Sequence, residues 1–312
     1  MAAKESLLIR VAELYYQQGL SQQRIAELLG VSRPTVSRLL DEARACGIVE
    51  IRVHAPLRKD AARSAALRDK LGLRDVVVVS GRLPYEQALR RAAQAAVELF
   101  SALLDNGLTI GLSWGRAQKL FCEVLPVQQH LYNVSVVQMV GCLGTGKPQL
   151  DGLELSLTLA KKLNGTFCNV YAPVYVDSEL VQSYLLKEPS IALAVRMANQ
   201  ADIVISGIGS LSDPDGSLNR AGYFTDAERT QLLDRGACAI LQGRILDRDG
   251  AELPVPGRYV VGAELDAMRR APWRIGINAG IGRAEETLAA VRSGCINALA
   301  VDEALADELL AL

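Results

Sequence analysis

The sequence predicts an α/β protein: an N-terminal helix-turn-helix domain followed by a larger, Rossmann-like domain with a mostly parallel sheet. Three observations lead to this prediction. The 312 residues are enough for two domains at roughly 150 residues each. Helical patterns separated by glycines fill the first 50 residues or so. From Val76 onward, short apolar runs alternate with Gly-containing loops and helical patterns, as in repeated βα units.

In the N-terminal part, three helices are predicted at residues 5–18, 22–29 and 33–46, each ended by the next glycine. Ser21 and Ser32 are suited to cap the second and third helices, and Pro34 falls in a first turn, where its missing N–H costs nothing. Residues 48–53 alternate between apolar and polar side chains and predict a short strand.

The predicted domains are residues 1–55, a connector helix within 56–73, and residues 74–312. Eight apolar runs in the last part are read as strands. They are Val76–Val79, Thr109–Leu112, Val134–Val140, Thr166–Tyr171, Ile203–Ser206, Cys238–Leu241, Arg274–Asn278 and Ala298–Val301. Because such runs are apolar throughout, we expect both faces of the sheet to be covered by helices.

The second and third helices meet the requirements of a DNA-binding helix-turn-helix. Ala26 is the small residue that the second helix needs and Gly30 makes the turn. The inward contacts are expected from Leu28, Val31, Val36 and Leu39. Outward donors for DNA bases and phosphates are predicted at Gln22, Ser32, Arg33, Thr35, Ser37 and Arg38. The alternative is an ordinary helical hairpin with a solvated basic face.

Composition narrows the function classes. The net charge is −1, so DNA binding must depend on where the arginines lie rather than on an overall basic excess. No apolar run approaches the roughly 18 residues of a membrane span, and the N-terminus lacks a secretory signal, so we expect a cytoplasmic protein with no membrane partner. With two histidines and no C-x-x-C spacing, we expect no metal site, no catalytic triad and no cofactor.

Four loops follow predicted strands, at residues 113–116, 141–147, 207–209 and 280–283. Ligands of open α/β sheets bind where such loops gather, although the glycines could also serve only to make tight turns. The predicted ligand-binding residues are Gly111, Ser113, Gly115, Arg116, Gly141, Lys147, Gly207, Gly209 and Arg283. The arginines are expected to hold an anion. Residues 213–216, Asp-Pro-Asp-Gly, read as a surface turn.

Two of these loops imitate active sites. Residues 111–115 spell the G-x-S-x-G of a hydrolase, but the histidine after Ser113, His130, comes too early in the chain to be its base. Residues 141–147 match the start of a P-loop, but Pro148 stands where a magnesium-binding Ser or Thr is needed. Neither activity is expected.

The chain resembles the SorC family of sugar-responsive transcriptional regulators over essentially its whole length. The motifs that carry the resemblance include Gly19-Leu20-Ser21-Gln22, Leu29-Gly30-Val31-Ser32-Arg33, Gly111-Leu112-Ser113-Trp114-Gly115, the run from Ala201 to Gly209, and Gly294-Cys295-Ile296-Asn297-Ala298-Leu299. The resemblance implies a DNA-binding domain joined to an effector domain related to sugar-phosphate isomerases. It also implies a homodimer or homotetramer on operator DNA.

The chain departs from the pattern of that family at three places, one of which is a pair of residues. Ala117 stands where many relatives have Thr, Ala239-Ile240 replaces a common Gly-Asp pair, and Arg283 stands in place of a Lys. We therefore expect a DNA-binding regulator controlled by a small carbohydrate, polyol or sugar phosphate. One alternative is a sugar-phosphate isomerase or deaminase with an added helical domain. Another is a DNA-binding protein that is tuned by protein contacts and senses no sugar.

Overall fold

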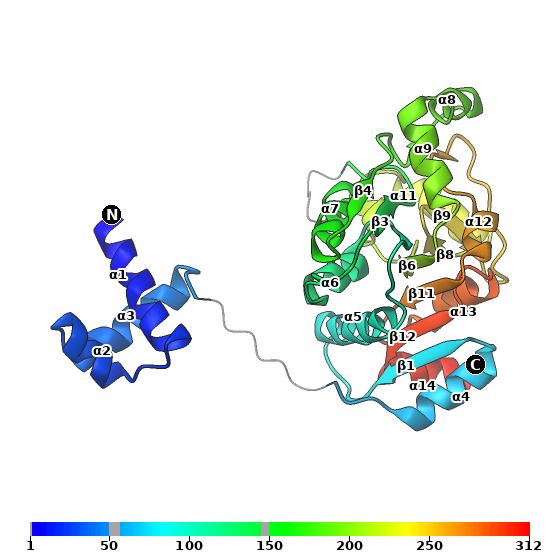
Figure 1. Cartoon of the computed structure of the whole chain (residues 1–312). Coiled ribbons are helices and arrows are strands. Elements are labelled where there is room, and N and C mark those ends of the chain that lie inside the picture. Colours follow the sequence, from blue (N-terminus) through cyan, green and yellow to red (C-terminus); the bar gives the residue numbers. More distant parts are fainter. Residues whose placement is uncertain (1, 50–56, 145–149) are drawn as a thin grey trace. The chain divides into compact units, whose positions relative to one another are not determined.

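The computed structural model describes residues 2–49, 57–144 and 150–312, with side chains from Ser6 onward (Figure 1). The chain divides into two compact units, Met1–Pro56 and Leu57–Leu312. The first unit contains helices alone among its described residues, and the second contains the sheets.

The described residues of the first unit form three α-helices and one π-helical turn. Helix α1 (Ala2–Ala12) continues into a π-helical turn, η1 (Glu13–Gln17), and is followed by α2 (Gln22–Leu29) and α3 (Arg33–Ala45). Helix α2 ends at Gly30, whose φ of 65° lies in the left-handed region that glycine adopts without strain. Ala26, Val36 and Leu39 are buried between the helices as predicted.

Two predictions for this unit were wrong. Leu28 is 54% exposed, and Ile25 fills the inward position instead, because the buried face of α2 runs through residues 25 and 26. Ile48 and Val49 are not in a strand; they pack against the helical core, and Val49 N–H donates to Ala43 O (3.1 Å). Residues 50–53 of that predicted strand lie outside the described residues.

The second unit is built on a seven-stranded sheet in which every neighbouring pair is parallel, ordered β1-β12-β11-β6-β2-β3-β4. The strands are β1 (Asp75–Val79), β2 (Thr109–Leu112), β3 (Ser135–Gln138), β4 (Thr166–Cys168), β6 (Ile203–Gly207), β11 (Trp273–Ile277) and β12 (Ala298–Asp302). The mostly parallel sheet is confirmed. Successive strands are added in opposite directions from the neighbours β2 and β6, which is therefore the point where ligands are expected.

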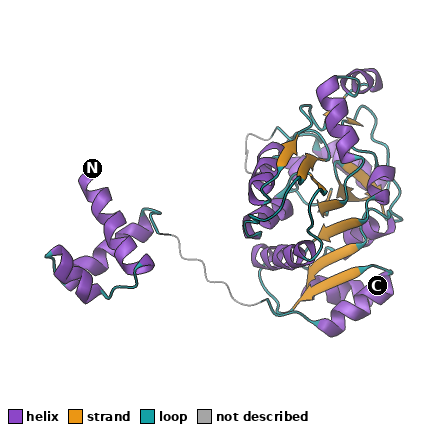
Figure 2. Ribbon diagram, viewed as in Figure 1, coloured by secondary structure: helices purple, strands orange, loops and turns teal. Residues whose placement is uncertain are grey.

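Helices cover both faces of this sheet, as the continuous apolar runs require (Figure 2). One face is covered by α5 (Tyr85–Ser101), α6 (Arg116–Val124) and α7 (Gly152–Lys162). The other is covered by α4 (Ala61–Leu71), α9 (Pro189–Ala198), α12 (Leu265–Arg270), α13 (Ala284–Arg292) and α14 (Glu303–Ala311).

Helix α4, expected as a connector, packs into the second unit. Its Leu67 is fully buried in the core, and Arg63 pairs with Asp307 of α14 (2.7 Å). The domain limits at residues 55 and 73 stay a prediction.

The run Cys238–Leu241 was wrongly assigned to the parallel sheet. It forms β8 (Ala237–Leu241), which pairs antiparallel with β7 (Gly209–Ser210) and β9 (Arg244–Asp247) in a separate small sheet. Strand β8 is buried on both sides, so its side chains have the same apolar pattern as those of a central parallel strand. The short elements around it are β5 (Tyr175–Val176), β10 (Tyr259–Val260), α8 (Glu179–Leu185), α10 (Ser217–Arg220) and α11 (Asp226–Asp234).

Candidate DNA-binding surface and effector cavity

The N-terminal turns of α2 and α3 are fixed by serine caps. Ser21 Oγ accepts from Arg24 N–H (3.2 Å), and Ser32 Oγ accepts from Thr35 N–H (3.3 Å). The hydroxyls of Ser32 and Thr35 also hydrogen-bond to each other (2.8 Å). These two predicted DNA-contact residues thus hold the start of α3 in place.

Arg33 and Arg38 differ from the other described arginines of this unit. Arg10, Arg24 and Arg44 each have a carboxylate partner one helical turn away, at 3.7, 3.0 and 2.5 Å respectively. Arg33 and Arg38 are exposed, and neither has a carboxylate partner among residues 6–49. Gln22, at the first position of α2, and Ser37 are partly exposed. Two free guanidinium groups near a helix N-terminus provide donors for DNA phosphates or guanine edges.

In the second unit, a cavity lies at the carboxyl ends of β2, β6 and β11, where the direction of strand order changes. Its walls come from the loop after β2 with the start of α6, from residues 207–210 after β6, from the loop leading to α10, and from Asn278 and Arg283 after β11. Its free volume is about 80 Å³, well below the roughly 300–1,000 Å³ of typical small-molecule sites. The cavity is therefore largely filled by the protein's own side chains.

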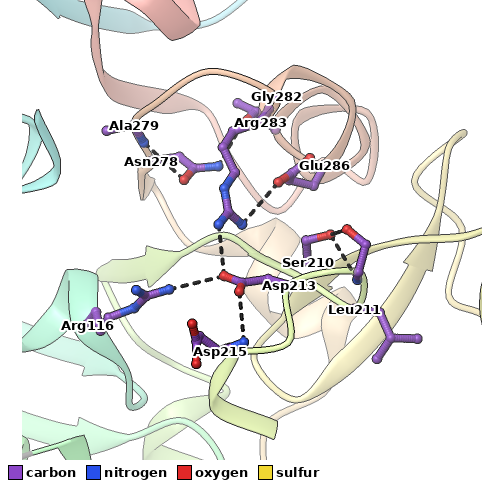
Figure 3. Close-up of polar contacts among 12 residues, drawn as sticks. Arg116, Ser210, Leu211, Asp213, Asp215, Asn278, Ala279, Gly282, Arg283 and Glu286 are labelled. Atoms are coloured by element: carbon purple, nitrogen blue, oxygen red, sulfur yellow. Dashed lines mark hydrogen bonds and ion pairs between the residues drawn. The ribbon is translucent and has the colours of Figure 1, made fainter. Parts of the chain in front are cut away.

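Two arginines and one aspartate of the cavity wall form a cluster (Figure 3). Asp213 Oδ2 accepts hydrogen bonds from Arg116 Nη2 (3.1 Å) and from Arg283 Nη2 (2.8 Å). The ring of Tyr85 lies beside both guanidinium groups: its centroid is 5.1 Å from Arg116 Cζ and 5.4 Å from Arg283 Cζ, within the range of cation–π interactions. Arg116 begins α6 and Arg283 precedes α13, so two strand-end loops bring them together.

Burial and charge oppose each other in this cluster. Burial by itself would raise the pKa of Asp213, but the hydrogen bond and charge of Arg283 outweigh it and hold that pKa below its usual range. Burial would likewise lower the pKa of Arg283, yet the bond to Asp213 raises it. Glu286, 3.4 Å from Arg283, has its pKa raised by burial. Asp213 is thus the charged partner on which the two arginines depend.

Uncharged polar groups form another part of the cavity wall. The side-chain oxygen of Gln118 faces Gly207. In this orientation Gln118 Oε1 accepts hydrogen bonds from Gly207 N–H (2.9 Å) and from Ser113 Oγ–H (3.0 Å). Asn278 Nδ2 donates to Thr287 Oγ1 (3.0 Å). The Ser113 hydroxyl is therefore engaged with an amide and has no base beside it among these contacts.

Gln242 has an unused acceptor in this wall. It is 4% exposed, and its Nε2 donates to Ser206 Oγ (2.8 Å), but its Oε1 meets no donor among the described residues. Its φ of 50° lies in the left-handed region, which a non-glycine residue adopts at a cost of about 1–3 kcal/mol. A buried, unsatisfied acceptor in a ligand cavity is suited to a hydroxyl group of the ligand.

The structure brings together six of the nine residues predicted for the effector. Ser113, Gly115, Arg116, Gly207, Gly209 and Arg283 line the cavity. Gly111 does not; it packs β2 against Met139, whose Sδ would be 2.3 Å from an added Cβ. Gly141 packs against the backbone of Pro173 and accepts a hydrogen bond from Trp114 Nε1 (3.1 Å). Lys147 lies outside the described residues.

Sequence reasoning missed seven polar residues of the cavity: Tyr85, Gln118, Ser210, Asp213, Ser217, Gln242 and Asn278. Asp213 does belong to a turn, closed by Gly216 N–H donating to Asp213 O (2.9 Å), but its side chain points to the arginines. Gln118 lies in the first turn of α6, directly after the strand-end loop at residues 113–116, so its closeness to that loop could have indicated it.

Two family models match this chain, one for each of its two units. Residues 55–311 match the family described as "Putative sugar-binding domain", and residues 2–48 match a homeodomain-like domain. The chain belongs to this sugar-binding family. The resemblance to SorC regulators and the predicted fold class are thereby confirmed.

Several relatives are similar to this chain over nearly its whole length. The sorbitol operon regulator of Klebsiella pneumoniae is 28% identical over 97% of both chains, and the deoxyribonucleoside regulator of Bacillus subtilis is 29% identical over 98% of both. The crystal structure of full-length SorC from Klebsiella pneumoniae superposes with a TM-score of 0.75, at 27% identity and 98% coverage of both chains. Among the described residues, no helix is long and apolar enough to span a membrane.

Proposed function

We propose that this chain is a DNA-binding transcriptional regulator whose operator binding is controlled by a small carbohydrate, polyol or sugar-phosphate effector. The observation that carries the proposal is a pair of exposed arginines on the capped third helix, Arg33 and Arg38, which have no carboxylate partner among the unit's described residues. Gln22, Ser32, Thr35 and Ser37 supply further donors on the same two helices. The names of two relatives, a sorbitol operon regulator and a deoxyribonucleoside regulator, support this assignment.

The cavity of the sugar-binding unit is the proposed effector site. It combines two guanidinium groups with the amides of Gln118, Gln242 and Asn278, which suits a hydroxylated ligand that also carries an anionic group. Trp114 and Ile240 add apolar surface. Ile240 stands where the family pattern has an acidic residue, and we assign a polar contact with the effector to the unsatisfied Oε1 of Gln242.

A binding role fits the cavity better than catalysis. None of its described lining residues is His, Lys or Cys, and Asp213, held ionised between two arginines, is a weak base. We therefore propose that the protein is not an enzyme and that no cofactor takes part. We further propose that it acts in the cytoplasm as a homodimer or homotetramer, and that the effector alters the spacing of the two recognition helices on half-sites about one DNA turn apart.

The test is a fluorescence anisotropy titration of the full chain on the intergenic DNA beside its own gene. It is performed at two salt concentrations, with a panel of sugars, polyols and their phosphates. We expect tight, salt-sensitive binding whose midpoint one compound shifts at least tenfold. Tight binding that no compound shifts would contradict the effector half of the proposal and favour control by protein contacts. Binding no stronger than to unrelated DNA would contradict the DNA half.

A further inference from the structure

The arginine pair of the effector cavity, Arg116 and Arg283, already holds an anion, and that anion is the protein's own Asp213. All three side chains are largely buried, with exposed fractions of 27%, 19% and 13% respectively. Two guanidinium groups brought this close in a partly buried site would repel each other without an anion between them. Asp213 therefore supplies the charge that allows the pair to exist in the absence of a ligand.

Asp213 uses only part of the hydrogen-bonding capacity of Arg116 and Arg283. Each guanidinium gives it a single hydrogen bond, both to the same oxygen, and neither contact is the two-bond pairing that arginine can make with a carboxylate or phosphate. The remaining contacts to carboxylates are long: Arg116 to Glu86 and Arg283 to Glu286, both at 3.4 Å. A ligand group with two or three anionic oxygens could therefore make more hydrogen bonds to the pair than Asp213 does.

Asp213 is carried by a short segment that is also a wall of the cavity. This segment, residues 211–216, links β7 to α10, and it is closed by the Asp213 carbonyl, which accepts from Gly216 N–H (2.9 Å) and from Asn219 Nδ2 (2.7 Å). Asp213 Oδ1 accepts Asp215 N–H (2.9 Å). Asp213, Gly216, Ser217 and Leu218 line the cavity. Because the free volume is only about 80 Å³, part of this wall has to move before a sugar-sized ligand can enter.

We propose that Asp213 is an internal competitor that occupies the anion-binding position of the cavity, and that an effector binds by displacing its carboxylate from Arg116 and Arg283. The displaced side chain takes residues 211–216 with it, which enlarges the cavity and couples ligand binding to the position of α10. This inference rests on the proposed function of the cavity. It adds that the affinity of an effector with an anionic group is limited by competition with Asp213.

The test compares the full-length protein with its Asp213→Asn variant, using inorganic phosphate as the probe and isothermal titration calorimetry in a phosphate-free buffer. Asparagine keeps the size of the side chain and an oxygen for Asp215 N–H, but removes the competing charge. We expect phosphate to bind the variant at least tenfold more tightly than the unaltered protein. Asp215→Asn is the matched control, because it removes one negative charge from an exposed position of the same segment; we expect a change of less than twofold.

A second measurement follows the segment itself. Hydrogen exchange of residues 211–220 in the unaltered protein should become faster when phosphate is saturating, and should already be fast in Asp213→Asn without phosphate. Equal or weaker phosphate binding by Asp213→Asn would overturn the proposal, since Asp213 would then be positioning the arginines rather than competing for them. Absence of binding to both proteins would overturn it too. The operator titration with neutral polyols is independent of these results, so a failure here is distinguishable from failure of the proposed function.

Discussion

The two units of this protein each present a pair of arginines, and the pairs differ in where their counter-charge comes from. Arg33 and Arg38 on the helix-turn-helix unit are exposed and have no carboxylate within that unit's described residues. Arg116 and Arg283 in the cavity are largely buried and share the carboxylate of Asp213. Exposed guanidinium groups are stabilised by water until DNA replaces it, whereas buried ones need a protein anion.

This difference teaches how one residue type can serve two kinds of recognition. An exposed pair is suited to bind a polyanion such as DNA. Binding releases counterions from the DNA, so the affinity falls as the salt concentration rises. A buried pair with an internal anion selects its ligand by competition, and salt screens it less. In the proposed regulator, the exposed pair is available to DNA, whereas the buried pair is occupied by Asp213 until a ligand displaces it.

The largest expected effect is on DNA binding. Arg38→Ala should weaken operator binding by about 1–3 kcal/mol, the cost of losing a contact to a base edge, because the variant lacks the guanidinium group that donates to the DNA. The measurement is fluorescence anisotropy at two salt concentrations. Arg44→Ala is the matched control, since Arg44 lies on the same helix but already pairs with Asp41; its operator affinity should change little. Equal losses in both variants would mean that pairing within the unit does not distinguish DNA-contacting arginines.

An intermediate effect concerns stability and pH. Asp213→Asn should lower the free energy of unfolding of the second unit by about 1–2 kcal/mol at pH 7. The pKa of Asp213 is lowered in the folded protein, so this contribution is fully present above about pH 4, the ordinary aspartate range, and is lost as the pH falls through the lowered value. The difference between variant and unaltered protein should thus be constant from pH 7 to 5 and narrow below pH 4.

Urea unfolding followed by tryptophan fluorescence measures this difference, because both tryptophans, Trp114 and Trp273, lie in the second unit. Glu286, whose pKa burial raises, contacts Arg283 (3.4 Å) and is present in both proteins. A difference that persists unchanged at pH 3 would show that the carboxylate charge does not stabilise the arginine pair.

The smallest expected effect is at the uncharged part of the cavity. Gln242→Met keeps the length of the side chain but removes the unsatisfied acceptor, and should weaken binding of the identified effector by about 0.5–1.5 kcal/mol. Calorimetry with the effector and with an analogue lacking one hydroxyl provides the check. The analogue that lacks the hydroxyl facing Gln242 should bind both proteins equally; a Gln242→Met loss of the same size for every analogue would contradict this contact.

Features set by local sequence were predictable, and features set by distant contacts were not. Serine caps and glycine stops determine the ends of α2 and α3 within a few residues, and strand ends place Arg116 and Arg283 at one edge of the sheet. Asp213 bridges Arg116, which is 97 positions away in the sequence, and Arg283, which is 70 positions away. The turn motif around Asp213 gave no indication of these distant contacts. Strand β8 was assigned to the wrong sheet because burial on both faces gives parallel and antiparallel strands the same pattern.

The central claim is that an effector bound at Arg116 and Arg283 controls the operator affinity of Arg33 and Arg38. Its most direct test is the shift in operator affinity caused by saturating effector, measured by anisotropy at fixed salt for the unaltered protein, Arg283→Gln and Arg283→Lys. We predict a shift of at least tenfold, about 1.4 kcal/mol of coupling, in the unaltered protein, a smaller one in Arg283→Lys, and none in Arg283→Gln. The same shift in all three proteins would contradict the claim, because the effector would then act without the arginine pair.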